Sequence, residues 1–402
     1  MAGFKKRPLG LYLHFPFCVR KCRYCDFLSF SADEAARVAY LKRLSEEIAR
    51  RGLQYDQYRI ETIFIGGGTP SLMSGSQLSE LMENISGNFD ISDHAEITME
   101  CNPGTVDGDK LKIFRTAGVN RLSFGLQSMN DRELQYLGRI HTAEQFIGNY
   151  RAARQAGFDN INIDLMSALP GQTTASWIDT LQKTAALEPE HISAYSLIIE
   201  ENTPFWKIYG CTDEKELEPM SSCDTVNSSS GKQIILPLPD EDSEREMYHL
   251  TKAELAARGY GRYEISNYAR QGFECRHNLT YWYRGDYLGL GLGAASMVEN
   301  QRFSNTADMR DYMEEWRSPV TEVLDAGAQM EETMFLGLRC TEGISLKQFE
   351  NHFGKTVMDV YGDVIRKYIN QGLIVCEIEK DRMYLTDAGL DVSNWILSDF
   401  LL

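Results

Sequence analysis

The sequence predicts an α/β fold, a partial (βα)6 barrel followed by a mostly helical C-terminal domain. Three observations lead to this prediction. In the first half, short apolar runs alternate with segments whose apolar residues recur every three or four positions. Polar side chains follow the ends of the apolar runs. After residue 326 the pattern changes to successive helices and a short hairpin. Strands that alternate with helices at this period indicate a parallel sheet with its chemistry at the carboxyl ends of the strands.

We expect four parts along the chain. The barrel covers residues 1–203, a loop or insertion 204–240, an accessory region 241–325, and the C-terminal domain 326–402.

The barrel elements follow from the two periodicities. Strands are expected at 11–15, 62–65, 96–100, 121–125, 160–165 and 191–197, and helices at 33–51, 75–89, 108–117, 131–137, 142–156 and 173–187. Gly118 directly follows the third helical pattern, a position where glycine commonly ends a helix.

Residues 204–240 show little periodicity and contain the run Asn227-Ser228-Ser229-Ser230-Gly231. Small polar residues bury too little apolar surface to order a segment strongly. We therefore interpret 208–235 as an insertion with weak order, in preference to a functional lid.

Helical patterns resume at 242–258 and again at 331–339, 345–353 and 356–371, before a hairpin near 373–385 and a final helix. Two helices followed by a two-stranded wing resemble a winged helix. This segment has no strong basic stripe, so we favour a domain that covers the barrel over one that binds DNA.

Composition limits the functional classes. Of 402 residues, 43% are apolar, and the net charge of -17 argues against wrapping a nucleic-acid backbone. Nine cysteines, an odd number, fit a reducing compartment better than a disulfide framework. The basic residues before the first strand superficially suggest a signal peptide, but His14 and Pro16 interrupt the apolar run. No apolar run approaches the ~18 residues of a membrane span. We expect a cytoplasmic protein.

Cys18, Cys22 and Cys25 form a Cys-x3-Cys-x2-Cys motif directly after the first predicted strand. A structural zinc site needs four ligands, and no second pair of cysteines or histidines follows at zinc spacing. Three thiolates can instead hold three irons of a 4Fe-4S cluster and leave the fourth iron open to another ligand. The alternative, three unrelated buried cysteines, does not account for their clustering on one loop with Arg20, Lys21 and Arg23.

Polar residues end the next strands. A glycine run, Gly66-Gly67-Gly68-Thr69-Pro70, follows the second strand, and Glu100, Gln127 and Asp164 end the third, fourth and fifth. Alone, the glycines indicate only a turn, and each polar side chain indicates a solvated or capping residue. Together on one rim they predict a single site, because an acid at such a position commonly binds ribose hydroxyls.

The cysteine loop resembles that of the radical S-adenosylmethionine (SAM) superfamily. Tyr12, six residues before Cys18, Tyr24 between the last two cysteines, and the glycine run are similar to the branch that holds oxygen-independent coproporphyrinogen III oxidase and the HemW heme chaperones. The oxidase pattern continues with Cys-x-Cys, whereas this sequence has Phe27 at the position of the last cysteine.

The resemblance covers about residues 8–200 and implies the cofactors, a 4Fe-4S cluster and SAM. It also implies roles for residues at matching positions. Cys18, Cys22 and Cys25 would bind the cluster; Gly67, Gly68 and Thr69 would lie against the methionine part of SAM, Glu100 and Arg139 would hold its charged end, Gln127 and Asp164 would face the ribose, and Tyr12 and Tyr24 would complete the cofactor site.

A second motif, His277-Asn278-x-x-Tyr281-Trp282, stands in the accessory region. From the residues alone, His277 is more readily a hydrogen-bonded structural histidine. The resemblance reverses this preference, because His-Asn-x-x-Tyr-Trp is a pattern of the HemW-like group. His277 is then the leading candidate for a heme ligand, with His14 and His141 as rivals.

Three functional classes remain: a heme carrier, a radical enzyme that decarboxylates coproporphyrinogen III, and a radical enzyme with an unrelated substrate such as nucleic acid. Net charge disfavours the third. Phe27 and the His-Asn-x-x-Tyr-Trp motif favour a heme chaperone without oxidase activity. By resemblance its partners are heme and acceptor hemoproteins, including membrane-associated ones, and a homodimer is an expected assembly.

Overall fold

The computed structural model describes residues 6–210, 235–314 and 319–402. Within these residues a twelve-stranded sheet has the order β12-β11-β10-β9-β1-β2-β3-β4-β5-β6-β8-β7. Its central six strands are parallel: β1 (Arg7–Phe15), β2 (Tyr58–Gly67), β3 (Ile91–Cys101), β4 (Arg121–Gln127), β5 (Ile161–Ser167) and β6 (His191–Ser196). The two outer strands of the described sheet do not pair with each other, so the barrel is open. The predicted fold class is confirmed.

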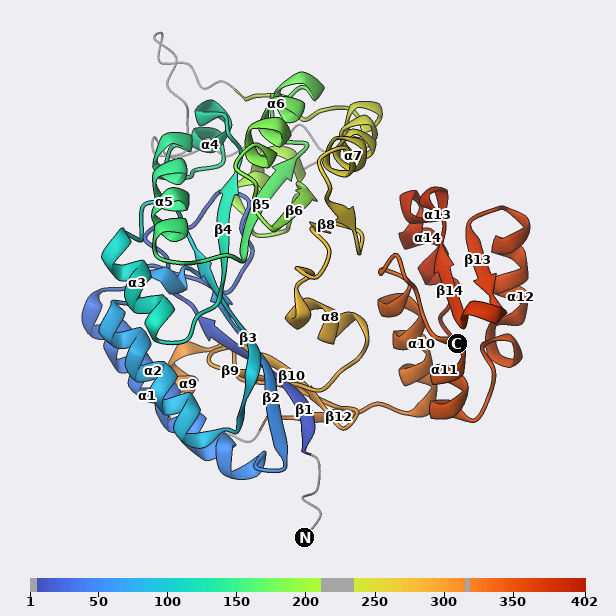
Figure 1. Ribbon diagram of the computed structural model, residues 1–402, viewed down its shortest axis with the longest axis horizontal. Helices are drawn as coiled ribbons and strands as arrows, with labels where there is room; N and C mark the ends of the chain where they lie inside the picture. The colour runs from blue at the N-terminus through green and yellow to red at the C-terminus, as the bar shows by residue number, and fades with distance from the viewer. Residues whose placement is uncertain (1–5, 211–234, 315–318) are drawn as a thin grey trace.

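Helices cover the outer face of the curved sheet (Figure 1). They are α1 (Glu34–Gln54), α2 (Gly75–Asn88), α3 (Gly108–Thr116), α4 (Asp131–Tyr136), α5 (Ala143–Gln155) and α6 (Thr174–Ala185). Their starts are set locally, because an Asp, Ser, Asn or Thr side chain at each N-cap accepts a hydrogen bond from a backbone N–H of the first turn. All six predicted strand-helix units are present, and most strands are longer than their apolar centres predict.

The accessory region extends the sheet at both edges. On one side β9 (Tyr287–Leu290) runs parallel to β1, followed by antiparallel β10 (Ala295–Val298), β11 (Gln301–Ser304) and β12 (Thr321–Val323). On the other side β8 (Asn267–Ala269) is antiparallel to β6 and pairs with β7 (Gly261–Arg262). The remaining helices here are α7 (Glu241–Ala256), α8 (Arg276–Trp282) and α9 (Met309–Glu314).

Helix α8 lies on the inner side of the curved sheet, toward the C-terminal domain (Figure 1). The carboxylate of the buried Glu96 of β3 accepts hydrogen bonds from the backbone N–H groups of Arg276 and His277, at 3.1 and 3.0 Å. A carboxylate at a helix N-terminus satisfies free N–H groups and favours the helix dipole. Glu96 therefore fixes the His-Asn-x-x-Tyr-Trp segment against the barrel interior.

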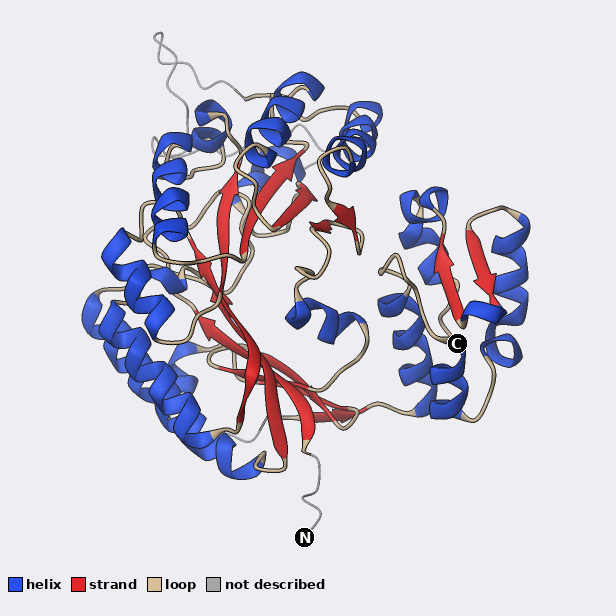
Figure 2. Ribbon diagram, in the orientation of Figure 1, coloured by secondary structure: helices blue, strands red, loops and turns tan. Residues whose placement is uncertain are grey.

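The C-terminal domain contains α10 (Ala326–Gly337), α11 (Leu346–Phe353), α12 (Val357–Asn370), the hairpin β13 (Ile374–Glu377) and β14 (Arg382–Leu385), α13 (Asp387–Asp391) and α14 (Ser393–Ser398). Figure 2 shows it as a separate group of helices around two strands. Its core is a distinct cluster of buried residues that includes Met334, Phe349 and Ile365. The helices and hairpin predicted here are confirmed.

The segment predicted as a loop after β6 is partly helical. Trp206–Gly210 forms a π-helical turn, and the Tyr209 hydroxyl is hydrogen bonded to the Tyr136 hydroxyl at 2.6 Å. The Leu236 N–H donates to the same Tyr136 oxygen at 3.2 Å. Both ends of the proposed insertion are therefore anchored to α4. Its centre, including Cys211 and Cys223, lies outside the described residues.

Within the described ranges, every helix is too short or too polar to cross a lipid bilayer.

Candidate functional site

The cysteine loop runs across the carboxyl end of the sheet between β1 and α1. Its backbone is fixed at several points: the Cys18 N–H donates to Phe30 O, the Arg23 N–H to Leu137 O, and the Phe205 N–H to Arg23 O, each at 3.0 Å. All three cysteines are free and partly exposed. A loop held by its backbone keeps its thiols in place for a bound group.

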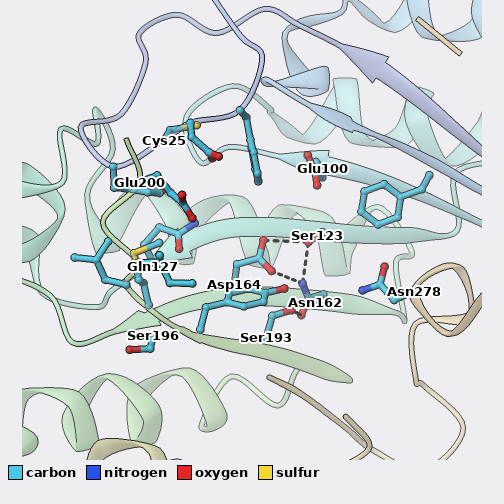
Figure 3. A pocket seen from close by; sticks show the side chains of 18 of the residues that line it. Cys25, Glu100, Ser123, Gln127, Asn162, Asp164, Ser193, Ser196, Glu200 and Asn278 are labelled. Carbon is cyan, nitrogen blue, oxygen red and sulfur yellow. Dashed lines mark hydrogen bonds between the residues drawn. The ribbon is translucent and has the colours of Figure 1, made fainter. Parts of the chain in front are cut away.

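One cavity of about 130 Å³ unites the predicted residues. Its lining includes Cys18, Cys22, Cys25, Tyr24, Gly67, Gly68, Thr69, Glu100, Gln127, Arg139 and Asp164. A larger cavity of about 320 Å³ adjoins it and shares Tyr24, Cys25, Phe27, Glu100, Ser123, Gln127 and Asp164 (Figure 3). The structure therefore brings together eleven of the thirteen residues predicted for the site; Tyr12 and His277 lie outside this lining.

The glycine run allows the cysteine loop to approach β2 closely. A Cβ on Gly68 would lie 2.7 Å from the carbonyl oxygen of Phe17. Gly67 has a φ of +108°, and a Cβ there would lie 2.5 Å from the His14 ring. Both positions require glycine, since any side chain would clash or be strained. The turn predicted from the glycines alone is real, and it also forms a wall of the cavity.

Glu100 is a partly buried carboxyl group that accepts a hydrogen bond from the Gly67 N–H at 3.0 Å. Burial, with a further contribution from the negative charge of Asp164, raises the pKa of Glu100 to about 8. No cation is paired with it among the described residues. A carboxyl group in this state is suited to a positively charged ligand group, which would restore its ionised form.

Asp164 of β5 lines the same cavity as Glu100. It accepts hydrogen bonds from Asn162 Nδ2 at 2.7 Å and from the Ser123 hydroxyl at 3.2 Å (Figure 3). Burial raises its pKa, and these hydrogen bonds counter the rise. Its orientation is fixed by neighbours on β4 and β5, so it is ready to accept hydrogen bonds from a ligand.

Gln127 ends β4 in a left-handed conformation, with a φ of 74°. The pairing of β4 with β5 shifts register between Gly125 and Gln127. A non-glycine residue in this region costs of order 1 kcal/mol, and such strain concentrates at functional sites. Because of this irregularity, the largely buried Gln127 side chain lines both cavities.

Arg139 links the rim to the cysteines. Its guanidinium donates to Asn102 Oδ1 at 2.8 Å, to Gly125 O at 2.5 Å and to Cys22 Sγ at 3.5 Å. Asn102 Nδ2 donates to the Thr69 hydroxyl at 2.8 Å, and that hydroxyl donates to Cys18 Sγ at 3.4 Å. Two of the three sulfur atoms therefore receive hydrogen bonds from one connected network.

The residues present fit both a cluster and a charged ligand. The Arg139 Nε–H is buried without a hydrogen-bond partner, a donor suited to a carboxylate. No three His, Cys, Asp and Glu side chains in the described ranges converge on one metal ion. A 4Fe-4S cluster does not require such convergence, because each cysteine binds a different iron. Burial raises the pKa of Cys25 to about 11, which a bound cation would reverse.

The two tyrosines differ. Tyr24 lines both cavities, whereas the Tyr12 hydroxyl is hydrogen bonded to His14 Nδ1 at 3.0 Å and its ring stacks on Phe64. Tyr12 thus contributes to the packing beside the cavities and not to their lining. Its predicted place in the cofactor site stays a prediction.

His277 is buried, with both ring nitrogens in hydrogen bonds. Nδ1 lies 2.8 Å from the Thr62 hydroxyl, and Nε2 lies 2.7 Å from the Tyr281 hydroxyl. Burial lowers its pKa to about 3. Both ring nitrogens of His277 therefore have partners in this conformation, and its role as the heme ligand stays a prediction. The rivals His14 and His141 are also buried, and each is hydrogen bonded to a backbone carbonyl.

Two residues that sequence reasoning did not select are central here. Asn102 joins Arg139 to Thr69, and Asn162 holds Asp164. Asn102 directly follows β3, which ends at Cys101, so its place on the rim was the one signal that could have identified it. Asn162 lies within β5, two residues before Asp164, where side chains share one face of the sheet.

Comparisons with known proteins agree with this geometry. Residues 12–184 match the radical SAM superfamily, and residues 324–392 match the HemN C-terminal domain. The heme chaperone HemW of Lactococcus lactis is 35% identical, with 99% of this chain and 98% of that protein covered. HemW of Bacillus subtilis is 36% identical, over 97% and 98% of the two chains.

The chain belongs to the HemW family.

A solved structure shows the same fold. Coproporphyrinogen III oxidase (HemN) from Escherichia coli, a radical SAM enzyme, superposes with a TM-score of 0.81 over 99% of this chain and 91% of its own, at 23% identity. This chain thus shares its architecture with that enzyme, including the C-terminal domain. At this identity the likeness concerns the fold and not the activity.

Proposed function

We propose that this protein is a heme chaperone, which binds heme and a SAM-liganded 4Fe-4S cluster and delivers heme to acceptor hemoproteins. The similarity to HemW proteins along the whole chain is the observation that carries the proposal. Phe27 supports it, because this side chain occupies the place of a cysteine in the oxidase pattern. It is 62% exposed and lines both cavities.

In this proposal Cys18, Cys22 and Cys25 hold three irons of the cluster. The cluster supplies an open iron that SAM completes. Hydrogen bonds from Thr69 and Arg139 to the sulfurs of Cys18 and Cys22 would orient these side chains for the cluster.

The charged groups of SAM match the unpaired groups of the cavity. Glu100 would receive the ammonium group, and the free Arg139 Nε–H would donate to the carboxylate. Gln127 and Asp164 would face the ribose hydroxyls, and Gly67 to Thr69 would lie against the methionine chain. Each proposed contact uses a side chain that lines the cavity.

The proposal keeps the domain division given above, with residues 1–203 as the SAM core, 241–325 as the accessory region and 326–402 as the C-terminal domain. It also includes a cytoplasmic location, a homodimer and acceptor hemoproteins that include membrane-associated ones.

The deciding experiment separates a carrier from an oxidase. Anaerobically reconstituted protein is given heme in one assay, and coproporphyrinogen III with SAM and a reductant in another. E. coli HemN serves as the positive control for turnover. We expect heme binding with a distinct Soret band and unchanged coproporphyrinogen III. Decarboxylation of coproporphyrinogen III at about 1 per second or faster would contradict the chaperone function and favour the oxidase function.

A further inference from the structure

The seven histidines fall into two groups. Four are buried and hydrogen bonded through the ring, namely His14, His141, His191 and His277. Three are exposed, namely His94, His249 and His352. A histidine that binds heme iron must offer a lone pair, and the heme must be able to reach it. The exposed histidines are therefore the better candidates.

Of the exposed histidines, His352 lines a cavity that the proposed SAM site does not use. This groove, about 220 Å³, lies between α8, α10 and α11. His249 instead faces Asp391, with Nε2 at 3.3 Å from its carboxylate. Neither His249 nor His94 lines this groove or the two cavities at the rim.

Aromatic rings form much of the groove. The Phe349 and Phe353 rings are 4.7 Å apart, and the His352 ring meets Phe353 at 4.6 Å in an edge-on arrangement. Trp282 and Tyr283 line it from the end of α8. A flat, largely apolar ring system with a metal at its centre matches a surface of this kind.

Trp282 provides a second, independent indication of a ligand. Its indole Nε1–H is buried and has no hydrogen-bond partner among the described residues. A buried donor without a partner costs of order 1–3 kcal/mol, so it is normally satisfied by a ligand or a water molecule. An acceptor on a bound molecule, such as a carboxylate, would satisfy it.

The surroundings of His352 also suit ligation. Its Nε2 lies 3.3 Å from Gln329 Oε1, and Gln329 is itself fixed by a hydrogen bond from Nε2 to Leu324 O at 2.8 Å. An acceptor beside one ring nitrogen sets the tautomer and leaves the lone pair on the other.

We infer that heme binds by one edge in the groove between α8 and α11, with His352 as an axial ligand of its iron. This inference rests on the proposed chaperone function and names its heme site. The groove is smaller than the ~300–1,000 Å³ of pockets that enclose a ligand of drug size. Heme held by an edge stays open to solvent on one side, as a carrier that hands on its cargo requires.

The test is a hemin titration of the full-length protein and of His352→Ala, followed by the Soret band. We expect at least a tenfold loss of affinity and a shifted band in His352→Ala, with the original band restored by added imidazole. Iron-free protoporphyrin IX, which needs no axial ligand, should bind both proteins equally. His249→Ala is the matched control, an exposed helical histidine outside the groove, and should resemble the wild type.

A second variant tests the groove without changing the ligand. Trp282→Phe keeps the ring and removes the N–H, so hemin affinity should fall several-fold while the band position stays. Unchanged hemin affinity and spectrum in both His352→Ala and Trp282→Phe would overturn this site and leave the chaperone proposal intact. A wild-type protein that binds no hemin would overturn both.

Discussion

The rim of the barrel and helix α8 both carry motifs of the family, but the surroundings of the two motifs differ. At the rim, the thiols, the Glu100 carboxyl group and Arg139 line one cavity. Glu100 has no ion-pair partner among the described residues, and the buried Arg139 Nε–H has no hydrogen-bond partner there. In α8, His277 has a partner on each ring nitrogen, and the helix start is capped by Glu96. Unsatisfied groups around a cavity indicate a site, whereas a side chain whose polar atoms all have partners, such as His277, indicates a structural role.

The two ends of α8 show the same contrast within one motif. His277, at its start, is 1% exposed and joins α8 to β2 through Thr62. Trp282, at its end, keeps an unpaired N–H beside a groove. The motif therefore combines a residue that positions the helix with a residue that lines the groove.

The largest expected effect is at the cysteine loop. Cys22→Ala should abolish the cluster, because its sulfur belongs to the one set of three cysteines on a shared loop. Iron and sulfide analysis after anaerobic reconstitution should find about four of each in the wild type and almost none in the variant. Cys376→Ala, a half-buried cysteine of β13, is the control and should retain both. Full cluster content in Cys22→Ala would show that the loop is not the cluster site.

The next effect tests the structural role of α8. His277→Ala removes two buried hydrogen bonds and leaves a cavity, so the free energy of unfolding should fall by about 2–5 kcal/mol. Urea denaturation measures it, with His249→Ala as an exposed control within about 0.5 kcal/mol of the wild type. A stable His277→Ala protein whose heme spectrum is altered would restore His277 as the heme ligand.

The pH dependence of SAM binding tests Glu100. With a pKa of about 8 in the free protein, Glu100 is largely protonated near pH 6 and must lose that proton to pair with an ammonium group. SAM affinity should therefore weaken as the pH falls below about 8, by up to about tenfold per unit. Calorimetry in buffers of different ionisation enthalpy would detect the released proton.

The control for this prediction is Glu100→Gln, which keeps the shape and cannot titrate. It should bind SAM more weakly, with a much flatter pH profile between pH 6 and 8. The same slope in both proteins would assign the pH dependence to another group.

The smallest effect concerns the network behind the rim. Asn102→Ala leaves Arg139 and Thr69 in place but removes the hydrogen bonds that orient them, so SAM affinity should fall by about 0.5–1.5 kcal/mol with the cluster retained. Asn149→Ala is a matched control, because the Asn149 side-chain oxygen accepts a hydrogen bond from the Gly104 N–H and this residue lines neither cavity. Equal affinities in the two variants would limit Asn102 to a role in folding.

The sequence by itself determined the six strand-helix units, the cysteine loop and the rim positions of Glu100, Gln127 and Asp164. These follow from short-range patterns: the periodicity of apolar residues, the N-cap residues and the spacing of cysteines on one loop. The carboxyl ends of parallel strands meet at one edge, so their polar residues could be assigned to one site before any coordinates were known.

Only the tertiary structure decided the partners of these residues. The addition of β9 to β1 and of β8 to β6, the contact of Asn102 with Arg139, and the burial of His277 against Thr62 all join segments far apart in the chain. A periodic pattern shows which face of an element is buried, but not which distant side chain it meets. For the same reason the groove between Trp282 and His352 could not be read from a motif: its two sides belong to helices that only packing brings together.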